Sequence, residues 1–528
     1  MTENLAPAPE RIARMTTGVV ERLRQIVGDD GLVVDQHAMA DPAWPLKDPY
    51  WIPGDDTYDP SVAVHPTTVE QLQEVIRLAN EEKLPVWTHS QGRNNGYGGP
   101  SPRLGGSINI SLRRMNRILE INEELAYAVV EPGVRWFDLY DELRRRGSRL
   151  MVSVPDLGWG SVIGNSLDNG VTYLPYGPDF GAPCGMEVML PDGEIIRTGF
   201  GAMTDNPSFH LYKRGVGPVL DALFMQSNYG IVVKMGLWLM PQPETFAPLT
   251  LTVAKDADLA PAIDAIRELR LKNHLRGTPC LYNTIMAATM TGVPDVIAAG
   301  NRGIMAENEI DRIAEATGLG RWYVRTALWG DREEVDLQLL SIRKVWEAIP
   351  GAKATVSDYY SAEEYESIES ISDRILAGVP NLDVIKYKDD NFAHIGMSPL
   401  VPMQGGRVIE VVNLLREITH SEMGLNFKAG ILVTGERACA VVSSINFARN
   451  DAGEARRAYD VARIMIRKVA ELGYSEYRTH VDLMDDVAEL LDFNDHAYRR
   501  FCEKIKDAVD PNGILSPGRY GIWPGRDA

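Results

Sequence analysis

The sequence predicts an α+β fold in two domains, and three features of the 528-residue chain indicate it. Short apolar strands alternate with amphipathic helices up to about residue 240. A strongly apolar strand pattern then runs into WLMPQPET, residues 238–245, whose two prolines are typical of a domain boundary. From 246 to 474, strand and long helix patterns alternate as expected for strands with helices on one side. We therefore place domains at 1–245 and 246–474, followed by a C-terminal segment, 475–528.

In the first domain, the clearest element is a helix predicted over 68–82. Thr68 and Gln71 fit a capping box at its start. Its apolar face consists of Leu72, Val75, Ile76 and Ala79. Strands are predicted at 84–87, 108–112, 118–121 and 126–130, followed by a helix over 135–147 that ends at Gly147.

In the second domain, strands are predicted at 249–253, 322–328, 429–433 and 440–445, and helices at 259–271 and 452–472. Near the C-terminus, HAYRRFCEKIKDAV is a helical pattern stopped by DPNG, residues 510–513. The chain shows no internal repeat and no low-complexity segment.

Composition narrows the class of protein. The formal net charge of −19 argues against a nucleic-acid or anionic-membrane partner, which would require a basic face. The four cysteines, Cys184, Cys280, Cys439 and Cys502, form no C-x-x-C pair, which favours buried or free thiols in a reducing compartment. The scattered histidines suggest no metal site. The N-terminus has no apolar signal region and the chain has no long apolar run, so we expect a cytoplasmic protein.

A glycine-rich loop follows the strand predicted at 84–87. Its sequence, SQGRNNGYGGPSP (residues 90–102), would let backbone N–H groups approach a phosphate closely. It matches neither of the common nucleotide motifs, so a tight surface loop is an equal alternative for this loop alone. Two further loops of small and amide residues, 155–170 and 226–236, favour a shared ligand. Three such loops could converge on one long, phosphate-bearing cofactor of dinucleotide size.

Eight motifs, taken together, resemble one known family. They are RNNGYGG (93–99), EPGV (131–134), PDLGWGS (155–161), PYG (175–177), QSNYGIV (226–232), AHIGMSP (393–399), EYRTH (476–480) and DPNGILSPG (510–518). In this order they resemble the vanillyl-alcohol oxidase / p-cresol methylhydroxylase flavoproteins, and most closely the 4-phenol oxidases among them. The resemblance runs from about 62 to 523 and is weaker before 45 and across 290–390.

The resemblance implies an FAD-binding domain made from residues 1–245 together with the returning C-terminal segment, and a cap domain, 246–474, that covers the substrate. The FAD pyrophosphate would lie on the 92–99 loop. The residues expected to bind the cofactor are Gly92, Arg93, Asn94, Asn95, Gly96, Gly98, Gly99, Pro155, Leu157, Gly158, Ser161, Gly164, Asn165, Tyr176, Gly177, Glu187, Asn228, Gly230, Ile231, Val232, His394, Arg478 and Arg519.

His394, in NFAHIGMSP, carries a further implication. A lone histidine among apolar residues is more often a structural group. In the oxidase branch of the family, the histidine at this place is joined covalently to the flavin. We therefore expect FAD to be linked through His394 and reoxidised by O2, giving H2O2.

Tyr97, Tyr477 and Arg478 match the trio that binds a phenolic oxygen in the family. Two hydroxyl donors and a fixed positive charge favour a phenolate. Ionising a phenol of pKa about 10 at neutral pH takes about 3 pKa units, or about 4 kcal/mol. The alternatives are a buried tyrosine pair and an ion pair of Arg478 with Glu476 or Asp485.

Asp156 matches the family's acid near flavin N5, although aspartate is also common in turns. It would assist hydride transfer from the benzylic carbon, or direct water onto the p-quinone methide that results. Pro155 would lie near the edge of the flavin that reacts with oxygen. Expected substrates are vanillyl alcohol and other 4-hydroxybenzyl alcohols, and 4-alkyl- or 4-allylphenols such as eugenol.

The cap-domain strand around 430 departs from the family pattern. Gly430 replaces a larger polar residue, and Ala438 and Cys439 replace a pair of histidines. With Tyr97, Ser398, Leu432 and Tyr477 lining the substrate pocket, Gly430 predicts more room beside the ring. The segment 41–60 does not align.

Three alternatives stay open: a related dehydrogenase that uses another electron acceptor, an FAD oxidase of another alcohol, and a flavin-binding protein without catalysis. The family also implies a homodimer.

Overall fold

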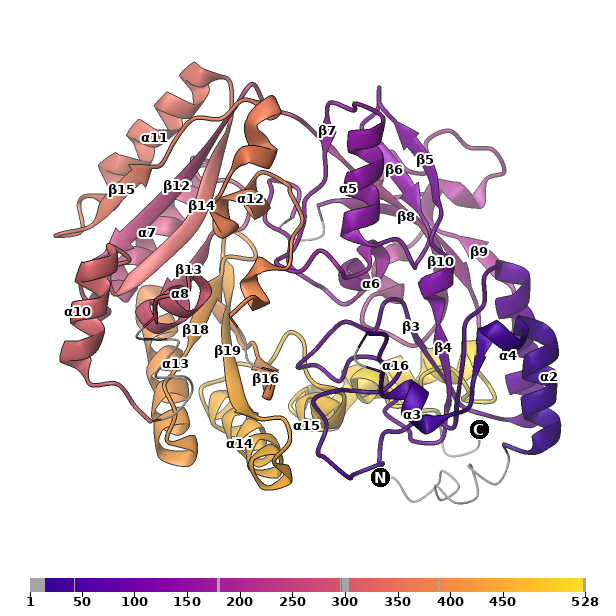
Figure 1. The fold of residues 1–528 in the computed structure, drawn as a ribbon. Coiled ribbons are helices and arrows are strands. Elements are labelled where there is room, and N and C mark those ends of the chain that lie inside the picture. The colour runs from indigo at the N-terminus through magenta and orange to yellow at the C-terminus, as the bar shows by residue number, and fades with distance from the viewer. Residues whose placement is uncertain are drawn as a thin grey trace.

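The computed structural model describes residues 15–41, 43–177, 181–294, 296, 303–387 and 390–525. The chain forms two lobes that lie side by side (Figure 1). One lobe contains the N-terminal half together with the C-terminal segment, and the other contains the middle of the chain. In the described part of the chain, no helix has both the length and the apolar character to cross a bilayer.

The first lobe contains two main sheets. The first has the order β1-β2-β4-β3, with β2, β4 and β3 parallel, and the second has the antiparallel order β5-β6-β10-β8-β9. Their strands are β1 (Leu32–Val33), β2 (Val62–Val64), β3 (Val86–His89), β4 (Ile108–Ser111), β5 (Ile118–Asn122), β6 (Tyr127–Val130), β8 (Pro183–Met189), β9 (Ile195–Arg197) and β10 (Ile231–Trp238). A small pair joins β7 (Leu150–Met151) to β11 (Met240–Pro241).

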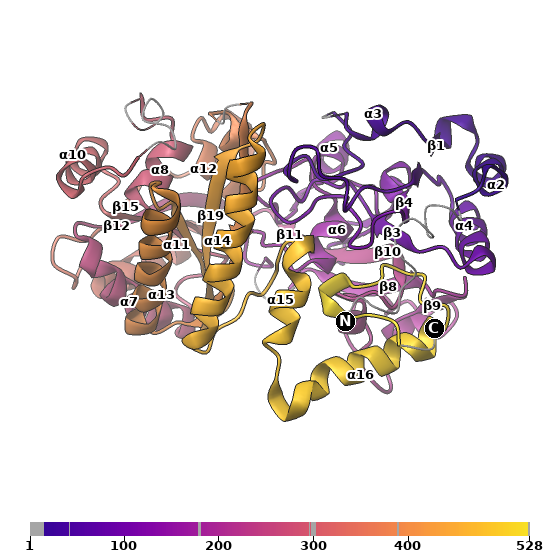
Figure 2. The same ribbon diagram turned by 90° about the horizontal axis from the view of Figure 1, so that it is seen from below.

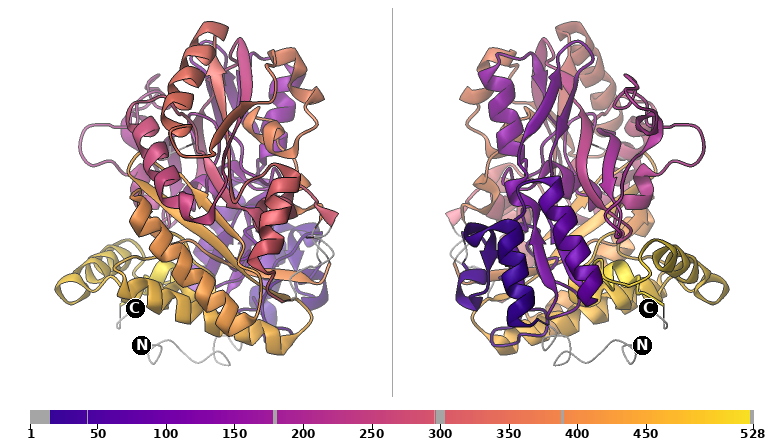
Figure 3. Two further views of the ribbon diagram at one scale, coloured as in Figure 1. Left: turned by 90° about the vertical axis from the view of Figure 1, so that its left-hand side faces the viewer. Right: turned by 90° about the vertical axis from the view of Figure 1, so that its right-hand side faces the viewer.

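The helices of this lobe are α2 (Thr17–Val27), α3 (Gln36–Met39), α4 (Val69–Glu82), α5 (Trp136–Arg145), α6 (Val162–Leu167), α15 (Met484–Glu489) and α16 (Phe493–Val509). Figure 3 (right) shows α2 and α4 against the parallel sheet. The predicted apolar face of α4 is fully buried. Its cap differs in one detail: Thr68 accepts a bond from the Gln71 N–H, but the Gln71 side chain accepts from Thr67.

The C-terminal segment joins the first lobe at the edge of the parallel sheet. The Val86 N–H donates to the Ile514 carbonyl at 2.8 Å, and the Ser516 N–H donates back to Val86 at 2.7 Å. Lys506 on α16 is fully buried, pairs with Asp510 at 2.6 Å, and donates to two backbone carbonyls. These bonds hold the segment after residue 475 beside the glycine-rich loop.

The second lobe is built on an eight-stranded sheet within the described residues. Its order is β15-β12-β14-β13-β18-β19-β16, with β17 also paired to β19. Its strands are β12 (Thr245–Val253), β13 (Cys280–Asn283), β14 (Trp322–Gly330), β15 (Lys353–Val356), β16 (Phe392–Met397), β17 (Leu400–Pro402), β18 (Ala429–Leu432) and β19 (Ala438–Ala448). Its helices are α7 (Leu259–Leu271), α8 (Thr284–Met290), α10 (Glu307–Thr317), α11 (Arg332–Trp346), α12 (Ile371–Leu376), α13 (Gly405–Ile418) and α14 (Ala452–Glu471).

As predicted, long helices cover one face of this sheet: α7, α11, α13 and α14 lie together on its outer side (Figure 2). The opposite face is turned toward the first lobe. Because side chains alternate along a strand, each strand serves both faces. On β14, Val324 packs in the outer core while Arg325 faces inward, and on β18 Ile431 packs outward while Leu432 faces inward. The inward positions build the candidate site.

Candidate active site

A cavity of about 660 Å³ lies between the two lobes, in the size range of cofactor and small-ligand sites. Its wall comes from the glycine-rich loop, the segments 155–171 and 224–232, the inward face of the cap sheet, and the C-terminal segment. The predicted residues that line it are Gly92, Arg93, Asn94, Asn95, Tyr97, Gly99, Pro155, Asp156, Leu157, Ser161, Gly164, Asn165, Gly230, Ile231, Val232, His394, Leu432, Tyr477, Arg478 and Arg519.

The other predicted residues lie behind this wall: Gly96, Gly98, Gly158, Tyr176, Gly177, Glu187, Asn228, Ser398 and Gly430. Glu187 pairs with Lys234 at 2.6 Å and with Arg197 at 2.9 Å, because these residues meet on neighbouring strands. The Asn228 amide donates to the carbonyls of Ser516 and Ile522. Both side chains therefore stabilise the fold around the cavity and do not face it.

The cavity contains buried polar atoms that have no hydrogen-bond partner within the described residues. They are His89 Nδ1, Asn95 Oδ1, Trp136 Nε1, Trp159 Nε1, Asn165 Nδ2 and Arg478 Nε. Unpaired buried polar atoms are costly, and a polar ligand would satisfy them. FAD, with its phosphates, hydroxyls and ring carbonyls, fits such a wall and the glycine-rich loop beside it.

His394 lies where this loop meets the cap sheet. A Cβ added to Gly96 would stand 2.6 Å from His394 Nε2, and Gly96 has φ +85°, so only glycine suits this position. The Gly396 N–H donates to the Gly96 carbonyl at 3.0 Å. Tyr50 belongs to the segment 41–60, which does not align with the family. It lines the cavity and contacts the His394 imidazole edge-on, with 5.4 Å between the ring centroids.

Tyr97, Tyr477 and Arg478 come together at one end of the cavity. The Arg478 guanidinium lies over the Tyr97 ring at 4.3 Å and over the Tyr477 ring at 5.7 Å. Burial opposes the charge of Arg478, yet the neighbouring tyrosine oxygens and the carboxylate of Asp168 leave the pKa of the guanidinium above its usual value. Burial also raises the pKa of Tyr477 to about 12, so its hydroxyl remains a donor at neutral pH.

The predicted alternative, an ion pair of Arg478 with Glu476 or Asp485, does not occur. Asp485 pairs with Arg103 at 2.8 Å, and Glu476 accepts from the Ser398 N–H. Burial raises the pKa of Glu476 to about 8, which keeps this acid neutral at pH 7. Within the described residues, no carboxylate lies in ion-pair range of Arg478. Asp168 acts on the guanidinium only from beyond ion-pair distance, so the cavity side of Arg478 is open to a ligand.

Ser398 supports this end from behind the wall. Its hydroxyl lies 3.2 Å from the Tyr97 hydroxyl, and the Tyr97 ring packs directly on Gly396, whose added Cβ would stand 2.5 Å from Tyr97 Cζ. The Gln226 amide donates to the Tyr477 carbonyl at 3.0 Å. These contacts fix two hydroxyl donors and one cation in place.

Asp156 lies at another part of the wall and is paired with Arg325. Both terminal nitrogens of the guanidinium lie 2.9 Å from Asp156 Oδ1, and the Tyr173 hydroxyl donates to Oδ2. Arg325 is only 1% exposed and lies over the Tyr173 ring at 4.2 Å and the Tyr282 ring at 5.6 Å. Burial opposes the charge on Arg325, but Asp156 leaves the pKa of the guanidinium well above its usual value.

Sequence reasoning missed Arg325, Tyr173, Tyr282, Tyr50 and Asp168. Arg325 stands in an apolar strand pattern, and that single charged residue in a predicted buried strand was the available signal. Asp168 lines the cavity, accepts from Asn94 at 2.8 Å and from the Tyr520 hydroxyl, and lies 3.6 Å from Arg519. It ties the glycine-rich loop to the C-terminal segment.

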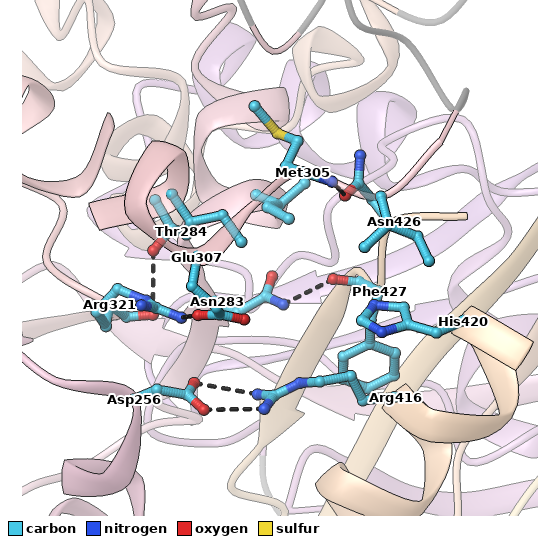
Figure 4. Close-up of a pocket in the computed structure, with 13 residues that line it drawn as sticks. Asp256, Asn283, Thr284, Met305, Glu307, Arg321, Arg416, His420, Asn426 and Phe427 are labelled. Carbon is cyan, nitrogen blue, oxygen red and sulfur yellow. Dashed lines mark hydrogen bonds and ion pairs between the residues drawn. The ribbon is translucent and has the colours of Figure 1, made fainter. Parts of the chain in front are cut away.

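A second, much smaller pocket lies in the cap domain (Figure 4). Asp256 accepts from both terminal nitrogens of Arg416 at 2.9 and 3.0 Å, and Arg321 pairs with Glu307 at 2.6 Å. Its volume of about 30 Å³ is room for water, not for a substrate. Within the described residues, no group of three or more His, Cys, Asp or Glu could hold a metal ion.

Comparisons with known proteins identify the family of the chain. A family model described as an FAD binding domain matches residues 60–199, and one for the C-terminal domain of FAD linked oxidases matches 411–520. The chain is 32% identical, over 95% of both chains, to the 4-cresol dehydrogenase (hydroxylating) flavoprotein subunit of Pseudomonas putida. Among solved structures, 4-ethylphenol oxidase from Gulosibacter chungangensis superposes with a TM-score of 0.89 at 33% identity over 98% of both chains. p-Cresol methylhydroxylase with substrate bound gives 0.88 at 31% identity, over 96% of this chain and 98% of that one.

Proposed function

Because this chain belongs to the vanillyl-alcohol oxidase / p-cresol methylhydroxylase family of FAD-dependent oxidoreductases, we propose that it is an oxidase of para-substituted phenols. The observation that carries this proposal is Arg478, a half-buried residue of the cavity wall whose guanidinium lies over two tyrosine rings and has no carboxylate in ion-pair range within the described residues. A phenolate oxygen would supply the missing negative charge and accept bonds from Tyr97 and Tyr477.

The phenol end activates the substrate. Stabilising the phenolate at neutral pH takes about 4 kcal/mol, which two charge-assisted hydrogen bonds and a half-buried cation can provide. Glu476, whose pKa burial raises to about 8, does not compete for Arg478 at pH 7. The electron density of the phenolate oxygen then weakens the benzylic C–H bond at the para position.

Bound FAD would supply a two-electron acceptor for the hydride of the benzylic carbon, and its reoxidation by O2 would give H2O2. The glycine-rich loop, Asn165, Trp159 and Arg519 would hold it. We propose that His394 is its covalent anchor, because the imidazole lines the cavity directly against Gly96.

Asp156 acts at the para end. After the phenolate loses a hydride, the product is a neutral p-quinone methide. The quinone methide from a 4-hydroxybenzyl alcohol then loses its hydroxyl proton to give the aldehyde, and the quinone methide from a 4-alkylphenol adds water to give an alcohol. Asp156 is positioned to take that proton, and Arg325 and Tyr173 hold the carboxylate in one orientation.

A dehydrogenase that passes electrons to another protein is the second candidate, favoured by the 32% identity to a 4-cresol dehydrogenase subunit. The two functions separate in one experiment. The flavin absorbance of the purified holoenzyme is recorded under nitrogen, vanillyl alcohol or 4-ethylphenol is added, and air is then admitted. In an oxidase, the flavin absorbance falls when the phenol is added and recovers within the turnover time once air is admitted. One H2O2 forms for each aldehyde or alcohol produced. Bleaching without recovery would assign the dehydrogenase instead.

The covalent link is tested on the same preparation. Acid precipitation of the protein should leave the yellow flavin in the pellet, and His394→Ala should release it to the supernatant. Flavin that leaves the wild-type protein on precipitation would contradict the assignment of His394.

A further inference from the structure

The three groups that would hold the phenol oxygen come from two segments far apart in the chain. Tyr97 lies in the glycine-rich loop, whereas Tyr477 and Arg478 belong to the C-terminal segment. Hydrogen bonds weaken steeply when their distance and angle change, so the two segments must keep a fixed alignment for all three groups to reach one oxygen.

The two segments touch just beside these groups. The Val481 N–H donates to the Tyr97 carbonyl at 3.3 Å, and Val481 packs so closely on Gly98 that an added Cβ would stand 2.2 Å from Val481 Cγ2. Gly98 has φ +95°, so only glycine suits this contact. Ser398 supports both segments from the side of the cap domain. The opposite side is supported by the N-terminal segment.

Asp48, in that N-terminal segment, bridges the loop and the C-terminal segment. Its backbone N–H donates to Ser101 Oγ at 2.8 Å, and its Oδ2 lies 3.0 Å from His480 Nε2. Ser101 follows Tyr97 in the glycine-rich loop. His480 follows Arg478 in the C-terminal segment. One residue thus contacts both segments that carry the phenol-binding groups.

The pair of Asp48 and His480 is buried, and its hydrogen bonds are complete. The two side chains are 2% and 1% exposed. The Asp482 N–H donates to His480 Nδ1 at 3.0 Å, so Nδ1 carries no proton and the Nε2–H is available to Asp48. The other carboxylate oxygen, Oδ1, accepts from the Tyr50 N–H at 2.9 Å. A buried carboxylate with both oxygens bonded is held in one orientation, so it can position the groups that it contacts.

Aromatic rings enclose the pair. The Trp51 ring lies nearly parallel to the His480 imidazole, and Tyr459 of α14 meets the imidazole edge-on, with 5.0 Å between the ring centroids. The Tyr459 hydroxyl lies 3.1 Å from His480 Nε2 and donates to the Tyr50 carbonyl at 3.3 Å. The N-terminal segment, the cap domain and the C-terminal segment therefore meet at one imidazole.

We propose that Asp48 and His480 are a positioning pair for the phenol site. They hold the glycine-rich loop and the C-terminal segment in the alignment that lets Tyr97, Tyr477 and Arg478 bind one phenolate oxygen. Neither Asp48 nor His480 lines the cavity, so the pair acts through these three residues and not on the substrate itself. This inference rests on the proposed function and adds two residues to its site.

The test measures how well the holoenzyme ionises a bound phenol. 4-Nitrophenol is the probe, because it has no benzylic hydrogen to transfer and its phenolate absorbs at longer wavelength than the phenol. The midpoint of the phenol-to-phenolate change is followed by difference spectra across the neutral pH range. We expect the wild-type midpoint to lie below that of the free probe. Asp48→Asn turns an NH2 group toward one of two N–H donors, so the midpoint should rise by about one pH unit and the Kd by about tenfold.

His480→Gln and Asp256→Asn are the matched controls. A glutamine side chain can present an N–H donor where histidine has its Nε2–H, so His480→Gln should stay close to the wild type. Asp256 accepts two bonds from Arg416 in the small pocket of the cap domain, away from the cavity. Its replacement removes an ion pair and should leave the midpoint unchanged. Thermal unfolding of each variant measures any loss of stability separately.

A folded Asp48→Asn variant with the wild-type midpoint would overturn the inference, and so would an equal rise in Asp256→Asn. If Asp48→Asn does not fold, Ser101→Ala decides, because it removes only the oxygen that accepts from the Asp48 N–H. Its midpoint should rise by a smaller amount, and an unchanged midpoint overturns the inference alone. The failure of the proposed function is distinct: the wild type itself would then neither shift the ionisation of the probe nor oxidise 4-ethylphenol.

Discussion

Two arginines serve different parts of the same cavity: the half-buried Arg478 lines it, and the fully buried Arg325 holds Asp156 in its wall. Each guanidinium lies over two tyrosine rings. Their counter-ions differ: Arg325 is paired with Asp156 at 2.9 Å, whereas Arg478 has no carboxylate in ion-pair range within the described residues and is influenced by Asp168 only from further away. The nearest acid in sequence to Arg478, Glu476, is kept neutral at pH 7 by burial, which raises its pKa to about 8.

This difference indicates which of the two arginines is available to bind a negatively charged substrate. A largely buried cation without a close counter-ion favours the binding of an anion. In the proposed function, the anion at Arg478 is the substrate phenolate, whereas at Arg325 it is Asp156, which belongs to the protein. Arg478 is therefore the residue that would bind the substrate anion, and Arg325 is the residue that positions the carboxylate of Asp156. The predictions below separate these two roles.

The largest effect is expected for Arg478→Gln. Loss of the cation should lower kcat/KM for 4-ethylphenol by about 10³-fold, the equivalent of the 3 pKa units that ionise the phenol. The measurement is steady-state oxidation, together with the ultraviolet difference spectrum of the bound phenol, which should change from phenolate to phenol. Arg270→Gln is the control, because Arg270 is buried in the cap domain away from the cavity. If Arg478→Gln still binds the phenol as a phenolate, Arg478 is not the residue that stabilises the phenolate charge.

Asp156→Asn tests the other end. It should lower kcat by about 10²-fold or more, and leave Arg325 buried without its partner, at a cost of about 3 kcal/mol of unfolding free energy. The double variant Asp156→Asn with Arg325→Met should recover most of that stability but none of the activity. Chemical unfolding and steady-state rates measure the two parts. If stability is not recovered in the double variant, the pair does not hold Asp156 as described.

Gly96→Ala tests the contact between the glycine-rich loop and His394. The methyl would displace the imidazole, and the positive φ adds about 1–2 kcal/mol of backbone strain. We expect loss of covalently bound flavin, measured after acid precipitation. Gly54→Ala is the matched control, since Gly54 has φ +82° with nothing near its added Cβ. If both variants retain the same amount of covalent flavin, any loss would be due to backbone strain and not to the contact between residue 96 and His394.

The smallest effect concerns Glu476. Its folded pKa of about 8 lies above its ordinary 4.5, so the folded protein keeps a proton that the unfolded chain releases. Stability should therefore fall as pH rises from 4.5 to 8. Glu476→Gln removes this penalty. We expect its Tm to exceed that of the wild type by a few degrees at pH 8, at about 2 °C per kcal/mol, and to match it near pH 4.5. A difference that does not change with pH would show that Glu476 is ionised in the fold.

Much of the fold could be predicted because its signals are local. The apolar face of α4 and the cap at Thr68 are contained within fifteen residues, and the structure confirms them. The prolines of 238–245 predict a domain boundary at that stretch, and β12 begins at its last residue. The pairing of Val86 with the segment around Leu515 could not be derived from local pattern, because it joins positions more than 400 residues apart.

The candidate site divides in the same way. Tyr97, Asp156 and Arg478 stand in recognisable motifs, but the partner of Asp156 is 169 residues away on a strand whose pattern indicated only a buried core. Glu187 was expected at the cofactor and instead pairs across strands with Lys234 and Arg197. Tyr282 shows the same limit, since only strand register reveals that its ring fills the space beside Gly430.

The central claim is that a phenolate held by Arg478 drives the reaction. Its most direct test is to add 4-ethylphenol, and separately its methyl ether 4-ethylanisole, to the oxygen-free holoenzyme while recording flavin absorbance. The two compounds share the same para group and differ only in the ionisable hydroxyl. We predict rapid bleaching with 4-ethylphenol and none with 4-ethylanisole. Bleaching at similar rates by both would contradict the account, because hydride loss would then not depend on the phenolate.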